Sequence, residues 1–361
     1  MLGGETNVIS SGSANTAYDA SIVAGYGNSI VGSGRDGFVG AGYQNQVAGV
    51  EAAVTSGFQN QADATQGFVG GGASNVITSE GTAGVIVGGA DNALSGEYGA
   101  IAGGEYNNVV GEGAYVGGGG YNTASGEGAI VDGGFNSRAS GMFATVPGGY
   151  VNNAAGTYSF AAGARANAAQ TGTFVWSDGS DGDAILSSSR AYQFLARASG
   201  GVTFWTNAAS TVGATLAPGS GTWASASDRN LKTNVAPLDD AAVLDKVAAL
   251  PISRWSYKSE RGVHHVGPMA QDFYAAFGVG EDDKHITSID EDGVALAAIK
   301  ALHAENGTLR SETGTLRAEN VQLQSQTLRL HAQVAALRSA ESAQERQLQK
   351  LAAKVSALAR R

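Results

Sequence analysis

The sequence predicts a mainly β N-terminal half built from short repeats, then a small α+β domain, then a C-terminal parallel coiled coil. Three observations support this fold class. Of the 54 glycines, 40 lie in residues 1–172, the first lysine of the chain is Lys232, and leucine recurs every seven residues near the end. The predicted parts are therefore a repeat array at 1–172, a β-rich neck at 173–226, a small domain at 227–299 and a coiled coil at 300–361.

The composition narrows the classes of function. The net charge is −10, and the basic excess is confined to residues 300–361, so the body of the chain is acidic, which argues against nucleic-acid binding. The chain has no cysteine, which excludes disulfides and cysteine-ligated metals, and we expect no metal and no cofactor. No apolar run approaches the ~18 residues of a membrane span, and the first residues lack the features of a signal peptide.

A Gly-x-x-Asn unit recurs through the array with a mean spacing of about 16 residues. Short runs of small and β-branched residues flank it, which predicts two short strands per coil, joined by turns where glycine and asparagine adopt positive φ. Stacked coils would bury only a thin core of Ala, Val, Ile and Gly, so we expect several chains to associate side by side. The asparagines are Asn7, Asn28, Asn45, Asn60, Asn75, Asn92, Asn107, Asn122, Asn136 and Asn152, followed by Asn167 with glycine four residues earlier.

We interpret these asparagines as turn formers whose side chains make ladders along the stack. The alternative is a flat array that binds a ligand or ice. Aromatic residues in or beside the same turn are interpreted as packing residues, and the alternative is a stripe that contacts sugars. The aromatic residues are Tyr26, Tyr43, Phe58, Tyr106, Tyr121, Phe135 and Tyr150.

The repeat period is lost between residues 173 and 226. The runs 174–176 and 202–205 are aromatic and β-branched, and they lie beside Asp-Gly and Gly-Gly turn signals. This pattern predicts strands, and we therefore interpret the segment as a β-rich neck.

The boundary after the neck contains a serine and a lysine five positions apart, Ser227 and Lys232. A lysine can activate a serine nucleophile once its pKa, ordinarily about 10.4, is lowered by about three units, most simply by burial. Residues five apart face different sides of a strand or helix, so the pair needs a turn between them or must meet across subunits. Asp228 and Asn230 are suitable turn residues. Spacing alone is a weak indication of catalysis.

Leucine at every seventh position predicts a parallel coiled coil in residues 300–361. The alternative is one long amphipathic helix that packs on its own domain. With leucine at the d positions, the a positions include Asn306 and Asn320, which fix register at a cost in stability and often favour dimers. The leucines are Leu302, Leu309, Leu316, Leu323, Leu330 and Leu337, with Leu351 and Leu358 after an interruption at Gln344.

The period and small-residue texture of about residues 1–170 resemble the head repeats of trimeric autotransporter adhesins. The resemblance implies a left-handed parallel β-roll in which three chains pack side by side. Those adhesins end in a membrane-anchoring β-barrel, and we expect no such anchor here.

A second resemblance covers about residues 225–302 and the coiled coil. This region is similar to the C-terminal intramolecular chaperone auto-processing domain of phage endosialidase tailspikes and other tail fibres. The myelin regulatory factor family shares that domain. The motifs that carry it are Ser227-Asp228-x-x-Leu231-Lys232, Leu250-Pro251-Ile252 with Trp255-x-Tyr257, His265-Val266-Gly267-Pro268-Met269-Ala270-Gln271-Asp272, and Asp292-Gly293-Val294 before a helix.

This resemblance implies a domain that trimerises, nucleates folding of the β-structure before it, and then cuts itself off. The family's nucleophile falls on Ser227 and its base on Lys232. The scissile bond lies beside Ser227, with Ser227–Asp228 favoured and Ala226–Ser227 still open. His265, Gln271 and Asp272 match positions of the family, and whether they are structural or orient the site stays open.

The sequence therefore predicts a trimeric fibre or adhesin-like protein of a phage tail or a bacterial surface. Its C-terminal part would be a trimerisation chaperone and a serine endopeptidase that acts once, on its own chain. The alternative is a non-cleaving structural trimer with a permanent C-terminal stalk. We expect a homotrimer, a carbohydrate or protein receptor for the head, and an extracellular location on a cell surface or virion.

Overall fold

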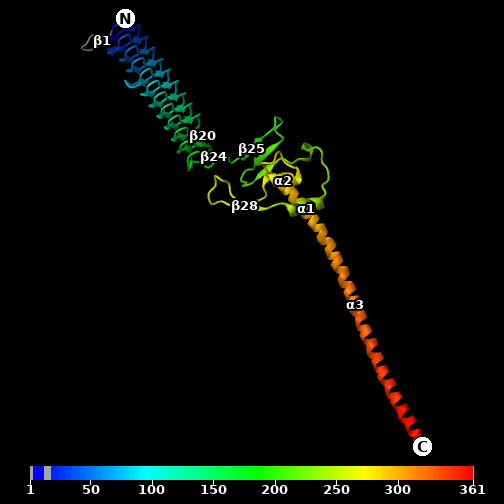
Figure 1. The fold of residues 1–361 in the computed structure, drawn as a ribbon. Helices are drawn as coiled ribbons and strands as arrows, with labels where there is room; N and C mark the ends of the chain where they lie inside the picture. The colour runs from blue at the N-terminus through cyan, green and yellow to red at the C-terminus, as the bar shows by residue number, and fades with distance from the viewer. Residues whose placement is uncertain (1–2, 12–17, 361) are drawn as a thin grey trace. The chain divides into compact units, whose positions relative to one another are not determined.

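A computed structural model describes residues 3–11 and 18–360 of the chain. They fall into two compact units, one ending at Leu231 and one beginning at Lys232. The first unit is a large parallel β-solenoid followed by a small antiparallel sheet, and the second is a small α/β region that ends in a long helix (Figure 1).

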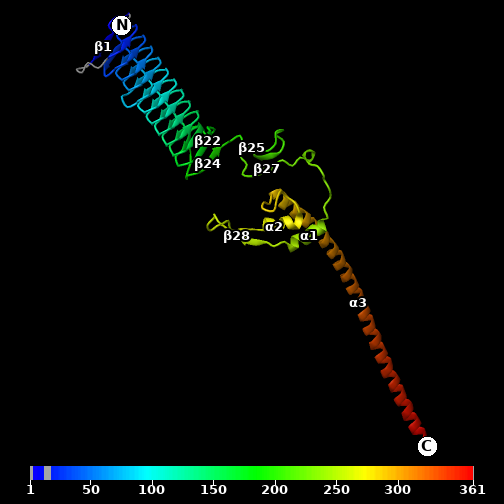
Figure 2. The same ribbon diagram turned by 45° about the horizontal axis from the view of Figure 1, so that its top comes forward.

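The solenoid consists of two 12-stranded parallel sheets, to which successive strands of the chain contribute alternately. Figures 1 and 2 show its coils as a regular stack, coloured blue to green. The first sheet contains, in spatial order, β1 (Val8–Ser11), β3 (Ser29–Gly32), β5 (Gln46–Val47), β7 (Gln61–Ala62), β9 (Val76–Ile77), β11 (Ala93–Leu94), β13 (Asn108–Val109), β15 (Thr123–Ala124), β17 (Arg138–Ala139), β19 (Asn153–Ala154), β21 (Ala166–Ala168) and β23 (Leu186–Ser187). The second contains β2 (Ser21–Ile22), β4 (Phe38–Val39), β6 (Ala53–Val54), β8 (Phe68–Val69), β10 (Val85–Ile86), β12 (Ala100–Ile101), β14 (Tyr115–Val116), β16 (Ile130–Val131), β18 (Thr145–Val146), β20 (Phe160–Ala164), β22 (Phe174–Asp178) and β24 (Phe194–Arg197).

Most solenoid strands are two residues long, and within them the first side chain faces outward and the second is buried. This follows from the alternation of side chains along a strand. The buried residues of the two sheets form one narrow core of Ile, Val, Leu and Ala, with Ile30, Ile86 and Leu94 fully buried. The predicted thin core of small and β-branched residues is confirmed.

A ladder of buried asparagines runs along the stack. The backbone N–H of Asn60 donates to Asn45 Oδ1 at 3.0 Å, and the Asn60 side-chain amide donates to the carbonyls of Ser56 and Gly72 at 3.1 and 3.0 Å. The two asparagines are 15 residues apart, whereas Asn28 and Asn45 are 17 apart. The ladder interpretation is confirmed for nine of the eleven predicted asparagines, and the extra residues of longer coils are accommodated outside the ladder.

Two asparagines of the predicted set lie outside this ladder. Asn136 has positive φ, and the neighbouring Ser137 takes the ladder position, accepting at Oγ from the Asn152 N–H at 3.3 Å. Likewise, the backbone N–H of Ala166 binds Asn152 Oδ1 at 3.0 Å, while Asn167 belongs to β21. The assignments of Asn136 and Asn167 were wrong because Gly-Gly pairs and a shortened coil shift the register by one residue.

The glycine three residues before each ladder asparagine is fixed by crowding as well as by its φ. Gly42 has a φ of +106°, and a Cβ there would lie 2.2 Å from the Gly57 carbonyl oxygen and 2.6 Å from Asn45 Nδ2. Both are far below van der Waals contact, so a side chain would displace the next coil and the ladder together. The spacing of three residues therefore couples the turn to the ladder.

Aromatic rings stack beside this turn. Tyr26 stacks on Tyr43, and Tyr43 stacks on Phe58, each with centroids 5.3 Å apart. Farther along, the Tyr106 and Tyr121 rings are 4.9 Å apart. The rings stack on one another while remaining partly exposed, which supports the interpretation of these residues as packing residues.

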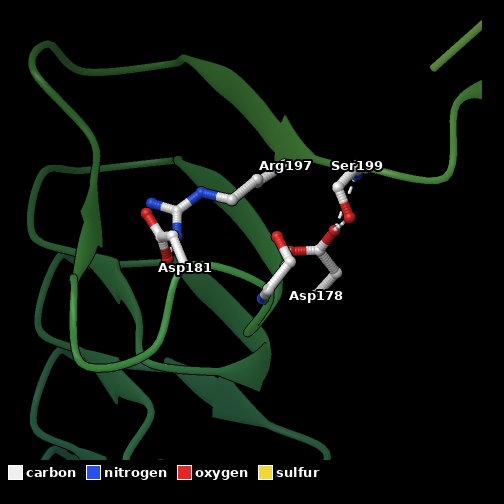
Figure 3. A network of polar contacts seen from close by, with 5 residues as sticks. Asp178, Asp181, Arg197 and Ser199 are labelled. Atoms are coloured by element: carbon white, nitrogen blue, oxygen red, sulfur yellow. Dashed lines mark hydrogen bonds and ion pairs between the residues drawn. The ribbon is translucent and has the colours of Figure 1, made fainter. Parts of the chain in front are cut away.

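The solenoid sheets continue past residue 172. β22 pairs in parallel with β20, and β24 pairs with β22, so the stack extends to Arg197. A polar network lies at this end (Figure 3): Asp178 accepts from the backbone N–H and hydroxyl of Ser199, both at 2.6 Å, and Arg197 pairs with Asp181. The hydrogen bonds from Ser199, followed by those from Ser180, hold the pKa of Asp178 well below its usual value.

The rest of the first unit is a three-stranded antiparallel sheet and one turn of 3₁₀-helix. The sheet contains β25 (Val202–Trp205), β26 (Gly213–Leu216) and β27 (Trp223–Ser225), and the turn is η1 (Arg229–Leu231). Phe204 and Trp223 stack at 5.7 Å on one face of this sheet, and both are more than half exposed.

The second unit contains α1 (Asp240–Ala249), the antiparallel pair β28 (Ser253–Trp255) and β29 (His265–Gly267), α2 (Ala270–Phe277) and α3 (Ser288–Leu358). Asp239 caps α1 by accepting from the Ala242 N–H at 3.1 Å. The start of α3 packs on α1, where Lys300 Nζ lies 2.6 Å from Asp240 Oδ2. α3 is 71 residues long and begins upstream of residue 300.

Candidate functional site

The segment that contains the predicted nucleophile follows β27 directly. Asp228 Oδ1 accepts from the backbone N–H of Asn230 at 2.9 Å and from its side-chain amide at 3.0 Å. The Leu231 N–H closes the turn on the Asp228 carbonyl at 3.1 Å. The turn predicted between Ser227 and Lys232 is therefore present, built by the asparagine and aspartate expected to form it.

Ser227 and Lys232 are both exposed, and they belong to different compact units of the chain. Ser227 lies near the end of the first unit, and Lys232 is the first residue of the second. Each of the two residues makes a polar or electrostatic contact, so neither is without a partner. Their pairing as nucleophile and base stays a prediction.

His265 is held in an aromatic cluster on the β28–β29 pair. Its ring stacks on Trp255, the residue directly opposite in the sheet, with centroids 4.6 Å apart, and Tyr257 meets it edge-on at 5.6 Å. Glu260 Oε2 lies 3.0 Å from His265 Nε2. The carboxylate and the two rings together fix the orientation of the imidazole.

A cavity of about 390 Å³ lies next to this cluster within the second unit. Trp255, Gly267 and Gln271 are among the residues that line it, together with Lys284 and Glu291. The indole Nε1 of Trp255 is buried and makes no hydrogen bond to any described residue. The cavity is therefore lined by aromatic side chains together with one basic residue, Lys284, and one acidic residue, Glu291.

Gln271 and Asp272 occupy the first turn of α2. Gln271 lines the cavity, while Asp272 places a negative charge at the positive end of the helix dipole, which stabilises the helix. The structure thus brings Gln271 and His265 to one small region of the second unit, because Trp255 adjoins both the cavity and the imidazole.

The sequence did not predict the whole of this cluster, and in particular not the contact of Glu260 with the imidazole. The spacing Trp255-x-Tyr257 places both rings on one side of an extended segment, which is a readable signal. Glu260 lies in the loop before β29, and nothing in its local sequence indicates that it would meet an imidazole five residues later. Only the pairing of β28 with β29 brings the two together.

Comparison with known protein families bears on this region. Residues 227–278 match the Peptidase S74 family, described as chaperone of endosialidase. The match begins at Ser227, and it covers η1, α1, β28, β29 and α2. The Peptidase S74 family implies a self-cleaving peptidase domain, and a chaperone-of-endosialidase domain indicates a trimeric protein of the phage tail-fibre kind. The comparison with curated proteins gives no match.

The described part of the chain contains no cluster of three or more His, Asp or Glu residues placed to hold a metal ion. None of its helices combines the length and apolar character needed to cross a membrane.

Proposed function

We propose that the chain is a homotrimeric fibre protein, of the phage tail-fibre or surface-adhesin kind, whose C-terminal part is a folding chaperone that cuts itself off beside Ser227. One observation carries the proposal: the match to the chaperone-of-endosialidase family begins at Ser227, two residues after the last strand of the β-structured part, β27. Residues 1–227, the solenoid and its neck, are the product, and residues 228–361 are the chaperone. An extracellular or virion location and a carbohydrate or protein receptor follow from this assignment.

In this proposal Ser227 is the nucleophile and Lys232 the base. The neutral Lys232 amine takes the hydroxyl proton of Ser227, and Oγ attacks the carbonyl carbon of the scissile peptide bond. The peptide nitrogen receives that proton and leaves as an amine, and water then hydrolyses the ester to a carboxylate and the free hydroxyl. Assembly would enclose Lys232 away from water and so gate the reaction by folding.

The two candidate bonds make different geometric demands. Within one chain the Ser227 hydroxyl reaches the Ala226 carbonyl through a five-membered ring, as in an N-to-O acyl shift. Attack on its own carbonyl needs a strained four-membered ring, so cleavage of Ser227–Asp228 requires the hydroxyl of another copy. The first residue of the released fragment, Ser227 or Asp228, distinguishes the two routes by mass spectrometry.

The shortage of core in the second unit supports association. Among the described residues after Leu231, the buried side chains are Phe273, Ala297, Ala298 and Ala301. Such a core is too small to stabilise a unit of this length alone. The leucines of the heptad on α3 are exposed, Leu302 by 49% and Leu337 by 69%, so association as a parallel coiled coil would supply the missing burial.

The outer face of the second solenoid sheet supports lateral packing of three heads. From β2 to β18 its outward residues carry no charge, and Phe38, Phe68 and Ile130 among them are more than a third exposed. The outward residues of the first sheet are instead mostly polar, as at Gln46 and Arg138. Burial of the apolar face between copies would yield about 25 cal/mol per Å² of apolar surface.

Denaturing electrophoresis of the assembled full-length protein tests the proposal. Wild type is expected to give fragments of about 227 and 134 residues from the 361-residue chain, and Ser227→Ala a single band. Lys232→Arg should also stay whole, because a guanidinium stays protonated. Lys246→Arg on α1 is the matched control and should cleave. An assembled wild type that remains full length supports the permanent stalk instead.

A further inference from the structure

Charged residues flank the leucine seam of α3 in a regular pattern. With leucine at d, the g positions of the first three heptads are Glu305, Glu312 and Glu319, and the e positions that follow the first two are Arg310 and Arg317. Every g residue of this stretch is acidic, and both of these e residues are basic. All five side chains are exposed in the chain as described.

These charges have no opposite charge within reach on their own helix. On a helix surface, side chains meet at spacings of three and four residues. The residues three and four positions from Glu312 and from Arg310 are threonine, leucine, asparagine and glycine. Glu305 and Arg310 are five apart, which places them about 140° apart around the helix. The acidic and basic rows are therefore complementary only between helices.

A parallel coiled coil brings the two rows together. In that arrangement a g residue faces the e residue five positions later on the neighbouring helix. Glu305 then faces Arg310 of the next copy, and Glu312 faces Arg317 of the next copy. An antiparallel pair would set like rows against each other, glutamate on glutamate and arginine on arginine. The complementarity thus identifies both the partner, a second copy of α3, and its direction.

The same stretch of α3 contains residues of low helix propensity and polar residues at the a positions. Gly307 and Gly314 are helix-destabilising residues at exposed positions, and the a positions Asn306 and Thr313 are polar. Downstream, the a positions Val334, Leu348 and Val355 are apolar and can supply affinity. Register in the upstream stretch therefore depends on polar contacts rather than on apolar packing.

We propose that Glu305 and Glu312 of each copy bind Arg310 and Arg317 of the adjacent copy, and that these pairs fix the α3 helices parallel and in register. The inference rests on the homo-oligomer of the proposed function and adds its orientation, register and selecting residues. Because the pairs lie at the start of the coiled coil, they align the chains next to the domain that α3 leaves.

Charge exchange in the full-length Ser227→Ala chain tests the pairs without loss of the helix. Glu305→Arg with Glu312→Arg, or Arg310→Glu with Arg317→Glu, sets like charges against each other. Each double variant should lower the association constant about tenfold or more at low salt. The quadruple variant, which exchanges both rows, should return to wild type, and Arg329→Glu at a c position is the matched control. Sedimentation equilibrium measures the association, and circular dichroism monitors the helix.

Two results would overturn the pairing: double variants that associate as wild type does, or a quadruple variant that stays as weak as the doubles. Orientation has its own readout because the chain has no cysteine. Thr313→Cys at an a position should form an interchain disulfide on oxidation, whereas Ser325→Cys at an f position should not. A Thr313→Cys chain that associates but fails to cross-link rules out the parallel, in-register arrangement. Cleavage plays no part in these measurements, so failure of self-processing leaves their outcome unchanged.

Discussion

The backbone N–H of Asn60 donates to Asn45 Oδ1 at 3.0 Å, and the N–H of Asn75 in the next coil donates to Asn60 Oδ1 at 3.1 Å. The Asn60 side chain therefore satisfies backbone groups of its own coil and of the next one, and its own N–H is satisfied by the coil before. The asparagines themselves are fully buried, so water cannot replace a lost partner of the N–H to Oδ1 bonds between them. The ladder contributes to stability mainly because the loss of one member orphans several buried groups.

Asn60→Ala removes the partners of the Ser56 carbonyl and the Asn75 N–H, and one of the two donors to the Gly72 carbonyl, which keeps the Phe58 N–H. We expect the free energy of unfolding to fall by about 2–4 kcal/mol, because each orphaned buried group costs about 1–3 kcal/mol. Gln46→Ala, on the outward side of β5, is the matched control and should change it by less than about 0.5 kcal/mol. Denaturant titration followed by circular dichroism measures both. Equal effects of the two variants would contradict the role of the ladder.

Ser137 occupies a ladder position with a shorter side chain than asparagine. A substitution to asparagine at this position should therefore stabilise the solenoid. Asparagine there would add amide donors to carbonyls of its own coil and the next, as Asn122 does with Gly118 and Gly134. We expect Ser137→Asn to raise the free energy of unfolding by about 1 kcal/mol and Ser137→Ala to lower it by about 1 kcal/mol. Thermal unfolding should rank the three proteins accordingly, and a less stable Asn variant would refute the argument.

The sequence was sufficient for the repeat architecture because one spacing, Gly-x-x-Asn, encodes both the turn and the ladder. Asn136 was assigned to the ladder because it follows Gly133 by three residues. Ser137 follows Gly134 at the same spacing, and only the pairing of coils shows that Ser137 takes the ladder position. The position at which the solenoid ends could not be predicted from the sequence for a related reason. Residues 179–185, between β22 and β23, loop out and break the period, while Val175 keeps its buried place in the stack.

The candidate site was less predictable than the fold. The turn at Asp228 and Asn230 follows from local side-chain chemistry, so the sequence indicated it. The contact of Glu260 with His265 depends on strand pairing and had no local signal. The relation of Ser227 to Lys232 depends on how units and copies assemble, which no spacing rule determines.

The end of the solenoid should be sensitive to acid through Asp178. Because hydrogen bonds from Ser199 lower its pKa in the folded state, Asp178 contributes stability that is present above the usual aspartate pKa, 3.8, and is lost as the pH falls toward the lower folded value. We expect Asp178→Asn to be less stable than wild type at pH 6, and the difference to shrink below about pH 4. Thermal unfolding at several pH values measures this.

Asp132→Asn provides a control outside the network, since Asp132 lies on an exposed turn of an earlier coil. Its difference from wild type should not follow the same pH course. A gap between Asp178→Asn and wild type that stays constant from pH 6 to pH 3 would rule out the linkage.

The aromatic cluster allows the packing and chemical roles of His265 to be separated. Phenylalanine preserves a flat ring against Trp255 and Tyr257 but cannot contact Glu260 through a ring nitrogen, whereas alanine removes the ring. Stacked aromatic pairs contribute about 0.5–1.5 kcal/mol beyond their buried area. If the ring acts by packing, His265→Phe should assemble and cleave as wild type does, and His265→Ala should lower the denaturation midpoint of the second unit. Should His265→Phe assemble fully and remain uncut, the imidazole itself would be required for the reaction, and Glu260→Gln should then slow cleavage as well, because Glu260 orients that ring.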